Sequence, residues 1–489
     1  MTRDTAELTD DVLDDIPLAH IPLPKSETPE ELEDLALGDD YALNPEYVEM
    51  VIDAADSGDT KRLRELVGAL DPADVADLMG FLTADYREQV IPLLDPEALG
   101  EIISEMDENL REEVLEATPS VTLARALEEL DTDDAADVID DLDDTKRFQV
   151  LAAMGETDRA AIETTLSYED ETAGRLMQRE FLAAPEFWTV GQTIDHVREA
   201  GDTLPELFFD VYVVDPTYKP VGAIPISTLL RSRRETPLAE LMEAVTEIDV
   251  AMDQEEVAYI FDKYHLISAP VIDPGGRLVG QITVDDIVEV IRDEAEEDIL
   301  ALAGVSDAGR DASVVEIVKS RLPWLMLNLA TATLAVSGVA IFQAEIAQLV
   351  ALAILMPIVS SLGGNAGTQT LAVAVRALAS KELTTANARR IITRELLVGL
   401  VNGLCLALVM GTATYLFFGP SDHHGKLAII VGSALVANIF TAAVGGILAP
   451  LALEKMGRDP AVSSSIFVTF LTDFTGFFAV LLIASLLLH

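Results

Sequence analysis

A single carboxylate in the last apolar stretch of the chain is the residue most able to do chemistry. Asp473 interrupts the otherwise uncharged run 460–488. A charged side chain near the middle of a membrane helix costs at least about 3 kcal/mol unless it is paired or faces water. Hydroxyls recur beside it, at Thr469, Thr472 and Thr475. The pattern predicts a cation ligand in a pore, and the alternative is a protonated, hydrogen-bonded structural Asp.

A glycine-rich segment is the second candidate. Gly363-Gly364-Asn365-Ala366-Gly367-Thr368-Gln369 lies in the uncharged run 346–375. Glycines permit close backbone approach, while Asn and Gln offer polar contacts. We expect a helix that is interrupted or loosened here, with Gly364 and Asn365 lining a pore. A tight helix crossing explains the same residues equally well.

A run of carboxylates between 285 and 298 is the third candidate. Asp286, Glu289, Asp293 and Glu297 are spaced by three or four residues, which places them on one face of a helix. Mg²⁺ or Ca²⁺ would relieve their mutual repulsion, since both ions prefer oxygen ligands. A solvated acidic face is the alternative.

Other chemical signatures are weak. His423 and His424 follow Asp422, a group that fits a soft metal ion but fits a solvated loop better. We find no Walker A loop, HExxH, CxxC pair or Ser/His/Asp signature, so we expect no enzyme. The single Cys405 excludes an intrachain disulfide framework.

Five apolar runs must position Asp473 and the glycine segment. They cover 322–344, 346–375, 396–421, 427–453 and 460–488, and about 20 apolar residues span a bilayer. In a five-pass arrangement, only Lys426 falls on the side opposite to the other basic residues. The positive-inside rule then predicts a cytoplasmic N-terminal region and an outside C-terminus. The other basic residues are Lys319, Arg321, Arg376, Lys381, Arg389, Arg390, Arg394, Lys455 and Arg458.

The acidity lies entirely before the membrane runs. The chain has 489 residues and a net charge of -53; residues 1–318 hold 22 Lys+Arg and 78 Asp+Glu, whereas residues 319–489 hold 10 and 7. A nucleic-acid partner is excluded, because a phosphate backbone requires a basic surface. Metal cations or a salt-rich environment fit this charge, and its excess beyond any sensor resembles halophilic adaptation.

The acidic region divides into a tail, a helical repeat and a β-rich part. Residues 1–45 read as a disordered tail. Between 46 and 170, apolar residues recur every twelve positions, as at Leu70, Leu82 and Leu94, with Thr118 the one exception. Cap-like residues follow several of them, such as Asp71-Pro72. We expect short helices stacked into a superhelix, and the alternative is an ordinary helical bundle with coincidental spacing.

Residues 171–300 contain a duplicated unit of about 60 residues. Apolar stretches at 211–215 and 269–273 are each followed by a turn and a Val-Gly pair, with glycines at 222 and 280. The units, about 175–236 and 237–298, resemble a tandem pair of CBS domains. That resemblance implies nucleotide binding by Thr283 and Asp286. Pro225 and Thr228 stand at the corresponding places of the first unit, so ATP or another adenine nucleotide is expected only in the second, where it is an open possibility.

The whole arrangement resembles the MgtE family of magnesium channels and transporters from about residue 45 onward. The specific motifs are Arg321-Leu322-Pro323-Trp324, Pro357 with the glycine segment, Arg376-Ala377-Leu378, and Thr472-Asp473-Phe474-Thr475-Gly476. The predicted fold class is thus multidomain: an all-α superhelical N domain, an α/β CBS pair, a connecting plug helix at 301–321, and a five-helix pore domain at 322–489.

The resemblance implies a Mg²⁺-selective homodimer in the cell membrane, with the pore between subunits and Mg²⁺-sensing cytosolic domains. Asp473 matches the pore aspartate. His265 stands where some members carry an acidic residue. The alternatives are transport of Co²⁺, Mn²⁺ or Zn²⁺, which the lack of His or Cys around Asp473 disfavours for soft metals, and a non-transporting nucleotide or metal sensor. The residues that match or adjoin the family's regulatory positions are Asp253, Glu255, Asp286, Glu289, Glu294, Glu297 and Asp298.

Overall fold

The computed structural model of the chain describes residues 32, 35–38, 41–95, 98–201, 204–205, 207–303, 305, 314–342, 346, 349–383, 387–418, 422–456, 460 and 464–488. Most of the expected acidic tail lies outside these residues, as does the stretch 306–313 of the expected plug helix. Contacts divide the chain into two compact units. The first is Met1–Leu130 with Asp137–Arg159, and the second is Asp131–Ala136 with Ala160–His489.

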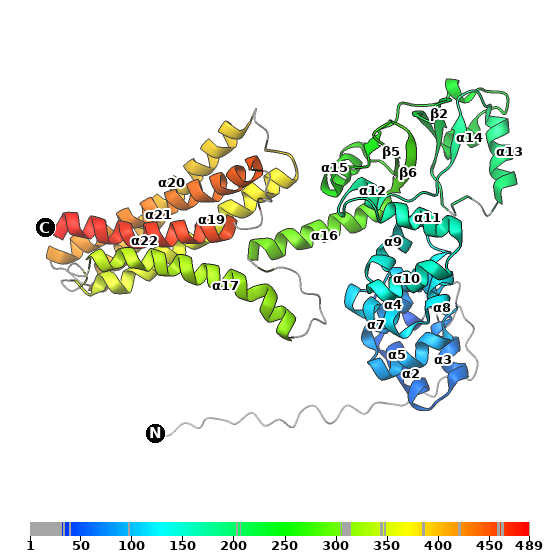
Figure 1. The fold of residues 1–489 in the computed structure, drawn as a ribbon. Coiled ribbons are helices and arrows are strands. Elements are labelled where there is room, and N and C mark those ends of the chain that lie inside the picture. The colour runs from blue at the N-terminus through cyan, green and yellow to red at the C-terminus, as the bar shows by residue number, and fades with distance from the viewer. Residues whose placement is uncertain are drawn as a thin grey trace. The chain divides into compact units, whose positions relative to one another are not determined.

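Short helices make up the first unit (Figure 1). They are α2 (Pro45–Asp56), α3 (Thr60–Val67), α4 (Pro72–Phe81), α5 (Ala84–Val90), η1 (Ile91–Leu93), α6 (Leu99–Ser104), α7 (Glu108–Ala117), α8 (Ser120–Leu127) and α10 (Asp144–Ala153). Two further helices, α9 (Thr132–Asp140) and α11 (Glu156–Thr165), belong partly to the second unit. Asp59 and Asp143 cap α3 and α10, because their side chains accept from the Arg62 amide at 3.1 Å and the Thr145 amide at 2.8 Å. Asp71, Thr83 and Asp107 occupy the N-cap positions of α4, α5 and α7 without a side-chain cap hydrogen bond.

The twelve-residue spacing has a structural cause. Leu82, Leu94 and Met154 are C-cap residues that turn into the core, where each is at most 9% exposed. Thr118, the polar exception, is also a buried C-cap residue, and its hydroxyl donates to the Val114 carbonyl at 2.7 Å. That hydrogen bond satisfies the buried hydroxyl, so a polar side chain is tolerated in the apolar series.

Two small sheets of identical topology follow in the second unit. Strands β1 (Ala183–Pro185), β2 (Asp210–Val214) and β3 (Pro220–Pro225) form one, and β4 (Ile248–Asp249), β5 (Ser268–Ile272) and β6 (Leu278–Thr283) form the other. In each sheet the first pair is parallel and the second antiparallel, with a register shift at the same place. The helices α12 (Ala173–Leu176), α13 (Val190–Ala200), α14 (Ile226–Arg231), η3 (Leu238–Glu240), α15 (Gln254–Tyr264) and α16 (Val284–Ala303) accompany the sheets.

The glycines that marked the duplication are close-approach positions. A Cβ at Gly222 would lie 2.7 Å from the Glu243 carbonyl oxygen, and one at Gly280 would lie 2.7 Å from the Gln178 carbonyl oxygen. Each glycine therefore lets a neighbouring segment reach the outer strand of its sheet. A chain of hydrogen bonds joins the two sheets, because the Tyr212 hydroxyl donates to Ser268 at 2.9 Å and Ser268 donates to Asp210 at 2.8 Å.

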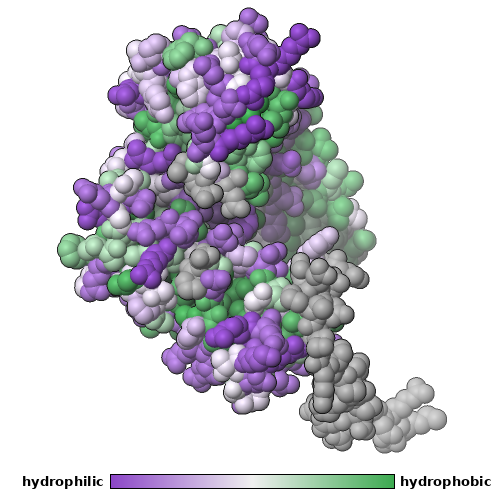
Figure 2. All heavy atoms as spheres, turned by 90° about the vertical axis from the view of Figure 1, so that its right-hand side faces the viewer, coloured by the Kyte–Doolittle hydropathy of each residue, from purple (hydrophilic) through white to green (hydrophobic). Residues whose placement is uncertain are grey.

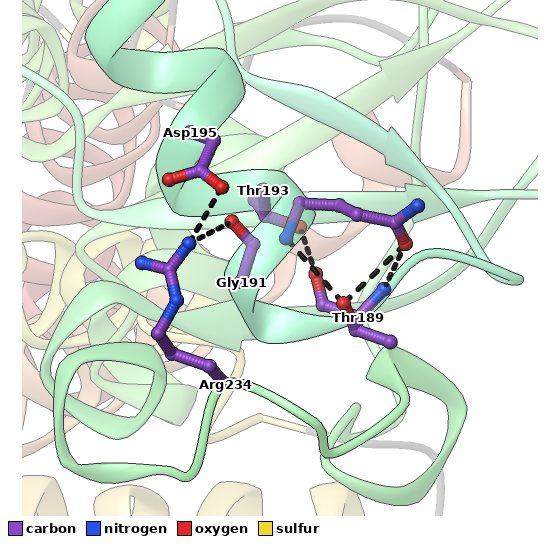
Figure 3. A network of polar contacts seen from close by, with 6 residues as sticks. Thr189, Gly191, Thr193, Asp195 and Arg234 are labelled. Carbon is purple, nitrogen blue, oxygen red and sulfur yellow. Dashed lines mark hydrogen bonds and ion pairs between the residues drawn. The ribbon is translucent and has the colours of Figure 1, made fainter.

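Local contacts link the start of α13 to the end of the first duplicated unit (Figure 3). Thr189 and Gln192 form a capping box. Arg234 pairs with Asp195 at 2.5 Å and also donates to the Gly191 carbonyl at 3.2 Å. These contacts tie the end of the copy back to its first long helix.

Within the described ranges of the second unit, five helices are long and apolar enough to span a membrane, as predicted. They are α17 (Val314–Ser337) with its extension η4 (Gly338–Phe342), α19 (Ala351–Ala379), α20 (Ala388–Phe418), α21 (Asp422–Lys455) and α22 (Ser464–Leu488). The apolar core is built mainly from α19, α21 and α22. The spans of α17 and α20 are mostly exposed along their length, which leaves apolar surface for lipid or for another subunit.

The expected interruption of the second span is wrong. Helix α19 continues without a break through Gly363 to Gly367. A Cβ at Gly363 would lie 2.0 Å from Asn438 Nδ2, and one at Gly367 would lie 2.4 Å from Val468 Cγ1. The glycines thus allow a tight helix crossing, which is the alternative that the sequence left open.

Hydrophilic side chains predominate on the face seen in Figure 2, with hydrophobic ones scattered among them. The charge arithmetic of the sequence leads to the same expectation, because 78 acidic residues precede the membrane runs. Such charged surface cannot be covered by a bilayer, so the membrane contact is left to the five apolar helices.

Replacing Gly280 tests the close approach in the second sheet. Gly280→Ala forces its methyl group against the Gln178 carbonyl and Met177, and overpacking of this kind costs roughly 1–3 kcal/mol. We expect faster amide hydrogen exchange in β5 and β6 of the full-length protein. Gly80→Ala is the control, because nothing lies within 4 Å of its added Cβ; equal protection of β5 and β6 in both variants would contradict the assignment.

Candidate metal sites

Asp473 lies on α22 and is partly buried. The Ser360 hydroxyl on α19 donates a hydrogen bond to its Oδ1, and Ser360 itself is only 5% exposed. Within the described residues, no basic side chain pairs with this carboxylate. Among the residues that the structure describes, the carboxylate therefore has one hydrogen-bond donor and no compensating positive charge, an arrangement that suits a cation ligand.

The polar residues expected around Asp473 have different environments. Thr469 and Asn365 are exposed in the single chain, and Gly364 is partly buried. Thr472 is fully buried, and its hydroxyl donates to the carbonyls of Val468 and Thr469 at 2.9 and 3.0 Å. Exposed polar groups at membrane depth need water or another subunit beside them.

Sequence reasoning missed two polar residues: one contacts Asp473, and the other contacts the residue that precedes the first one on α19. Ser360 is one, and Asn438 on α21 is the other; Asn438 is fully buried and donates through Nδ2 to the Val359 carbonyl at 2.8 Å. Both had a signal in the sequence. Asn438 is the one amide side chain in the uncharged run 427–453, and Ser360 lies three positions before Gly363, the start of the glycine segment.

A second group of carboxylates gathers where α15 faces α16. Asp253 caps α15 by accepting from the Glu255 amide at 3.0 Å, and Gln254 donates to Glu294 at 2.7 Å. Burial raises the pKa of Glu255, and the charges of Glu294, Asp253 and Asp298 raise it further. Mutual repulsion of this kind favours capture of a cation.

Glu294 experiences the same crowding. Burial is the largest cause of its raised pKa; the Gln254 hydrogen bond opposes the shift, and Glu297, Asp253 and Glu171 add to it. Glu171 was not foreseen, because it lies before the duplicated unit in the sequence. Among the described residues there is no group of three or more His, Cys, Asp or Glu side chains placed to hold a metal ion, so these carboxylates crowd one another without forming a finished cage.

The predicted single face of four carboxylates on α16 is divided in the structure. Arg292 pairs with Glu289 at 3.2 Å and with Asp293 at 3.3 Å, and both carboxylates are largely exposed. Asp286 instead lies at the N-terminal end of α16, where it accepts a hydrogen bond from the Thr283 hydroxyl at 2.7 Å. Thr283 and Asp286, the expected nucleotide ligands, are therefore hydrogen-bonded to each other.

Asp286 belongs to a third acidic group that sequence reasoning did not assemble. Burial raises its pKa to about 7, against the Thr283 hydrogen bonds and with help from Asp285 and Asp131. Asp133, on α9, is buried, and its pKa is raised by burial and then by the charge of Asp286. Among the described residues, Asp133 Oδ1 has no hydrogen-bond partner. The signal was the acidic stretch 131–134, which reads as an ordinary helix start.

The end of α16 contacts the membrane helices. Ala301 and Leu302 pack against Leu371 and Val375 of α19 and Val468 of α22. These are the helices that carry Ser360 and Asp473. Helix α16, which carries several of the crowded carboxylates, therefore packs against the two helices that carry Ser360 and Asp473.

In the part of the chain that the structure describes, five long apolar helices include a carboxylate without a basic partner and follow a strongly acidic region, an arrangement typical of a polytopic cation transporter. Comparisons with known proteins agree. Residues 356–483 match the MgtE family described as a divalent cation transporter, residues 70–171 match the MgtE intracellular N domain, and residues 238–293 match the CBS domain.

Curated relatives extend the match over nearly the whole chain. The magnesium transporter MgtE of Thermus thermophilus is 34% identical over 89% of this chain and 97% of its own length. That of Enterococcus faecalis is 35% identical over 67% of this chain and 72% of its own length. The chain belongs to the MgtE family of magnesium transporters. The family is one of transporters rather than enzymes, and its N domain is intracellular.

Solved structures resemble the region before the membrane helices. The cytosolic domain of the Mg²⁺ channel MgtE in complex with ATP is 32% identical over 50% of this chain and 99% of that chain, with a TM-score of 0.47. The soluble part of a magnesium transporter is 29% identical over 51% of this chain and 98% of that chain, with a TM-score of 0.46.

The raised pKa of Asp286 leads to a pH dependence. A carboxyl group with a raised folded pKa contributes stability that is complete below the unfolded value of 3.8 and is lost as the pH rises through about 7. Without divalent cations, we therefore expect amide exchange at the start of α16, after correction for intrinsic rates, to be faster at pH 8 than at pH 6. Asp286→Asn removes the ionisation and should abolish the difference.

Asp215→Asn is the matched control for that measurement. Hydrogen bonds, first from the Lys219 amide, hold the pKa of Asp215 below its usual range, so it stays ionised from pH 6 to 8. Its variant should keep the wild-type pH dependence at α16. The assignment is wrong if Asp286→Asn keeps that dependence as well.

Proposed function

We propose that the protein is a Mg²⁺-selective channel or transporter for magnesium uptake, with Asp473 as the pore carboxylate and cytosolic Mg²⁺ as the signal that closes it. The observation that carries the proposal is the partly buried Asp473 carboxylate, which has a single hydroxyl donor and no basic partner among the described residues. Mg²⁺ dehydrates reluctantly and keeps several waters. A carboxylate held by one hydroxyl suits a hydrated ion better than a closed cage of protein ligands.

The exposed polar positions of the membrane helices support a homodimer with the pore between subunits. Asn365 and Thr469 are exposed on the protomer although they lie in apolar spans. Lipid cannot satisfy such groups, whereas a second subunit or a hydrated pore can. In this proposal the N domain and CBS pair lie in the cytoplasm of a plasma-membrane protein, and the C-terminus lies outside, in keeping with the positive-inside rule.

Crowded carboxylates support closure by cytosolic Mg²⁺. Burial raises the pKa values of both Glu255 and Glu294; the charges of Glu294, Asp253 and Asp298 raise the first further, and those of Glu297, Asp253 and Glu171 raise the second. Bound Mg²⁺ would neutralise this repulsion and favour a compact regulatory domain, and loss of Mg²⁺ would favour separation. The contacts of Ala301 and Leu302 with α19 and α22 provide the route to the pore; of the expected plug helix, residues 304 and 306–313 lie outside the described residues.

The choice of ion and of nucleotide follows from the ligands available. The acidic groups offer oxygen ligands, which suit Mg²⁺ and disfavour soft metals such as Zn²⁺. Co²⁺ and Mn²⁺ are the alternative transported ions, and a flux assay would compare them with Mg²⁺. An adenine nucleotide such as ATP at the second CBS copy would have to replace the Thr283–Asp286 hydrogen bond.

Removing the pore carboxylate gives the first test of this function. In proteoliposomes, Asp473→Ala should reduce Mg²⁺ flux at least about tenfold, because the site loses its only charge. Asp473→Glu keeps the charge and should retain part of the flux. Equal flux through the wild type and Asp473→Ala would rule out Asp473 as the pore ligand.

Neutralising the regulatory carboxylates gives the second test. Glu294→Gln/Glu297→Gln/Asp298→Asn should pass more current than the wild type at high internal Mg²⁺, since fewer charges remain for the closing ion to neutralise. The control Glu235→Gln/Glu247→Gln/Glu296→Gln removes the same number of exposed charges outside the crowded group. Unchanged Mg²⁺ inhibition in the first variant, or equal relief in both, would refute the sensor.

A further inference from the structure

The membrane helices α19, α21 and α22 meet at a buried polar junction, which consists of Asn438, the Val359 carbonyl and Ser360. On α21, Asn438 is fully buried and donates through Nδ2 to the Val359 carbonyl of α19 at 2.8 Å. The next residue on α19, Ser360, donates to Asp473 on α22. The amide of Asn438 is therefore one residue away from the hydroxyl that holds the pore carboxylate.

Two glycines make room for this amide. A Cβ at Gly363 would lie 2.0 Å from Asn438 Nδ2, and a Cβ at Gly476 would lie 3.0 Å from Nδ2 and 3.0 Å from Ser360 Cα. Asn438 thus occupies the space that the missing side chains of α19 and α22 leave. All three helices are fixed against one another at the level of Ser360.

Burying the side-chain amide of Asn438 costs free energy of folding. Among the described residues, Asn438 Oδ1 is buried without a hydrogen-bond donor. Leaving a buried acceptor unpaired is unfavourable, and an apolar side chain of similar volume would avoid it. Neighbouring positions of α21, such as Leu435 and Ile439, are indeed apolar and buried. The Nδ2 donor must therefore supply something that packing alone does not.

We propose that Asn438 is a positioning residue for Asp473, acting through the Val359 carbonyl and Ser360. Its hydrogen bond fixes the rotation of α19, on which successive residues are separated by about 100°. A small rotation of α19 would turn the Ser360 hydroxyl away from the carboxylate. The inference rests on the proposed function, because it concerns how Asp473 is oriented toward the permeating ion.

A pair of variants separates this role from packing. Asn438→Ala removes both the amide and its volume, whereas Gly363→Ala/Asn438→Ala returns a methyl group to the place of Nδ2 without restoring the donor. We expect both to raise the Mg²⁺ concentration for half-maximal flux in proteoliposomes by roughly tenfold, as misplacement of a binding group does. Recovery of the wild-type value by the double variant would overturn the proposal.

The route through Ser360 has its own test. Ser360→Ala should raise the half-maximal concentration as Asn438→Ala does, and Ser360→Ala/Asn438→Ala should raise it no further, because both act on one hydrogen bond. Additive losses would overturn the proposed route. The matched control is Thr414→Val, which removes another buried membrane hydroxyl without a described partner and should leave half-saturation unchanged.

Failure of this inference can be told apart from failure of the proposed function. Flux through Asp473→Ala equal to the wild type overturns the pore assignment and this inference with it. An inactive Asp473→Ala together with wild-type half-saturation in Asn438→Ala overturns only the positioning role. Should Asn438→Ala not assemble in detergent, the Gly363→Ala/Asn438→Ala variant makes the same comparison, because its added methyl group restores part of the lost volume and the amide remains absent.

Discussion

The architecture depends on one electrostatic constraint, the cost of a carboxylate inside a membrane bundle. Asp473 is relieved by a hydroxyl from Ser360 and by no described basic residue. Where α19 and α22 approach this closely, Gly367 and Gly476 leave room for Val468 and Ser360, and Gly363 leaves room for Asn438 of α21. The tight crossing and the polar junction at Asn438 are thus consequences of accommodating one charge.

Carboxylates are also placed unfavourably outside the membrane, where several of them lie close together. Around Glu255 and Glu294, and again around Asp133 and Asp286, burial and like charge raise the pKa values, and at Glu255 the charge of Lys381 opposes the shift only in part. A protein stabilised only by its own contacts would neutralise such groups. Their persistence fits a domain whose compact state is completed by a bound cation. Arg292, beside Glu289 and Asp293, marks where α16 is neutralised internally.

Much of the fold could be predicted because it follows local rules. The five spans follow from apolar length, the helix starts after Asp71 and Thr83 from residue types that favour N-cap positions, and the duplication from glycines at equivalent places in two sheets. The interruption of α19 was predicted wrongly, because a glycine cluster has the same local signature whether a helix breaks or is closely crossed. Only the neighbour, Asn438, decides between the two.

The sequence by itself determined the family, the order of domains, the membrane spans and the existence of an isolated membrane carboxylate, since these depend on composition and spacing along the chain. The tertiary structure decided which residues share a site. Ser360 and Asp473 are 113 positions apart, and Gln254 and Glu294 are 40 apart. Burial of Thr472, exposure of Asn365 and the pKa of Asp286 likewise depend on which helix faces lie together. Hydrogen bonding and desolvation act through space, and no local pattern in one helix specifies its neighbour.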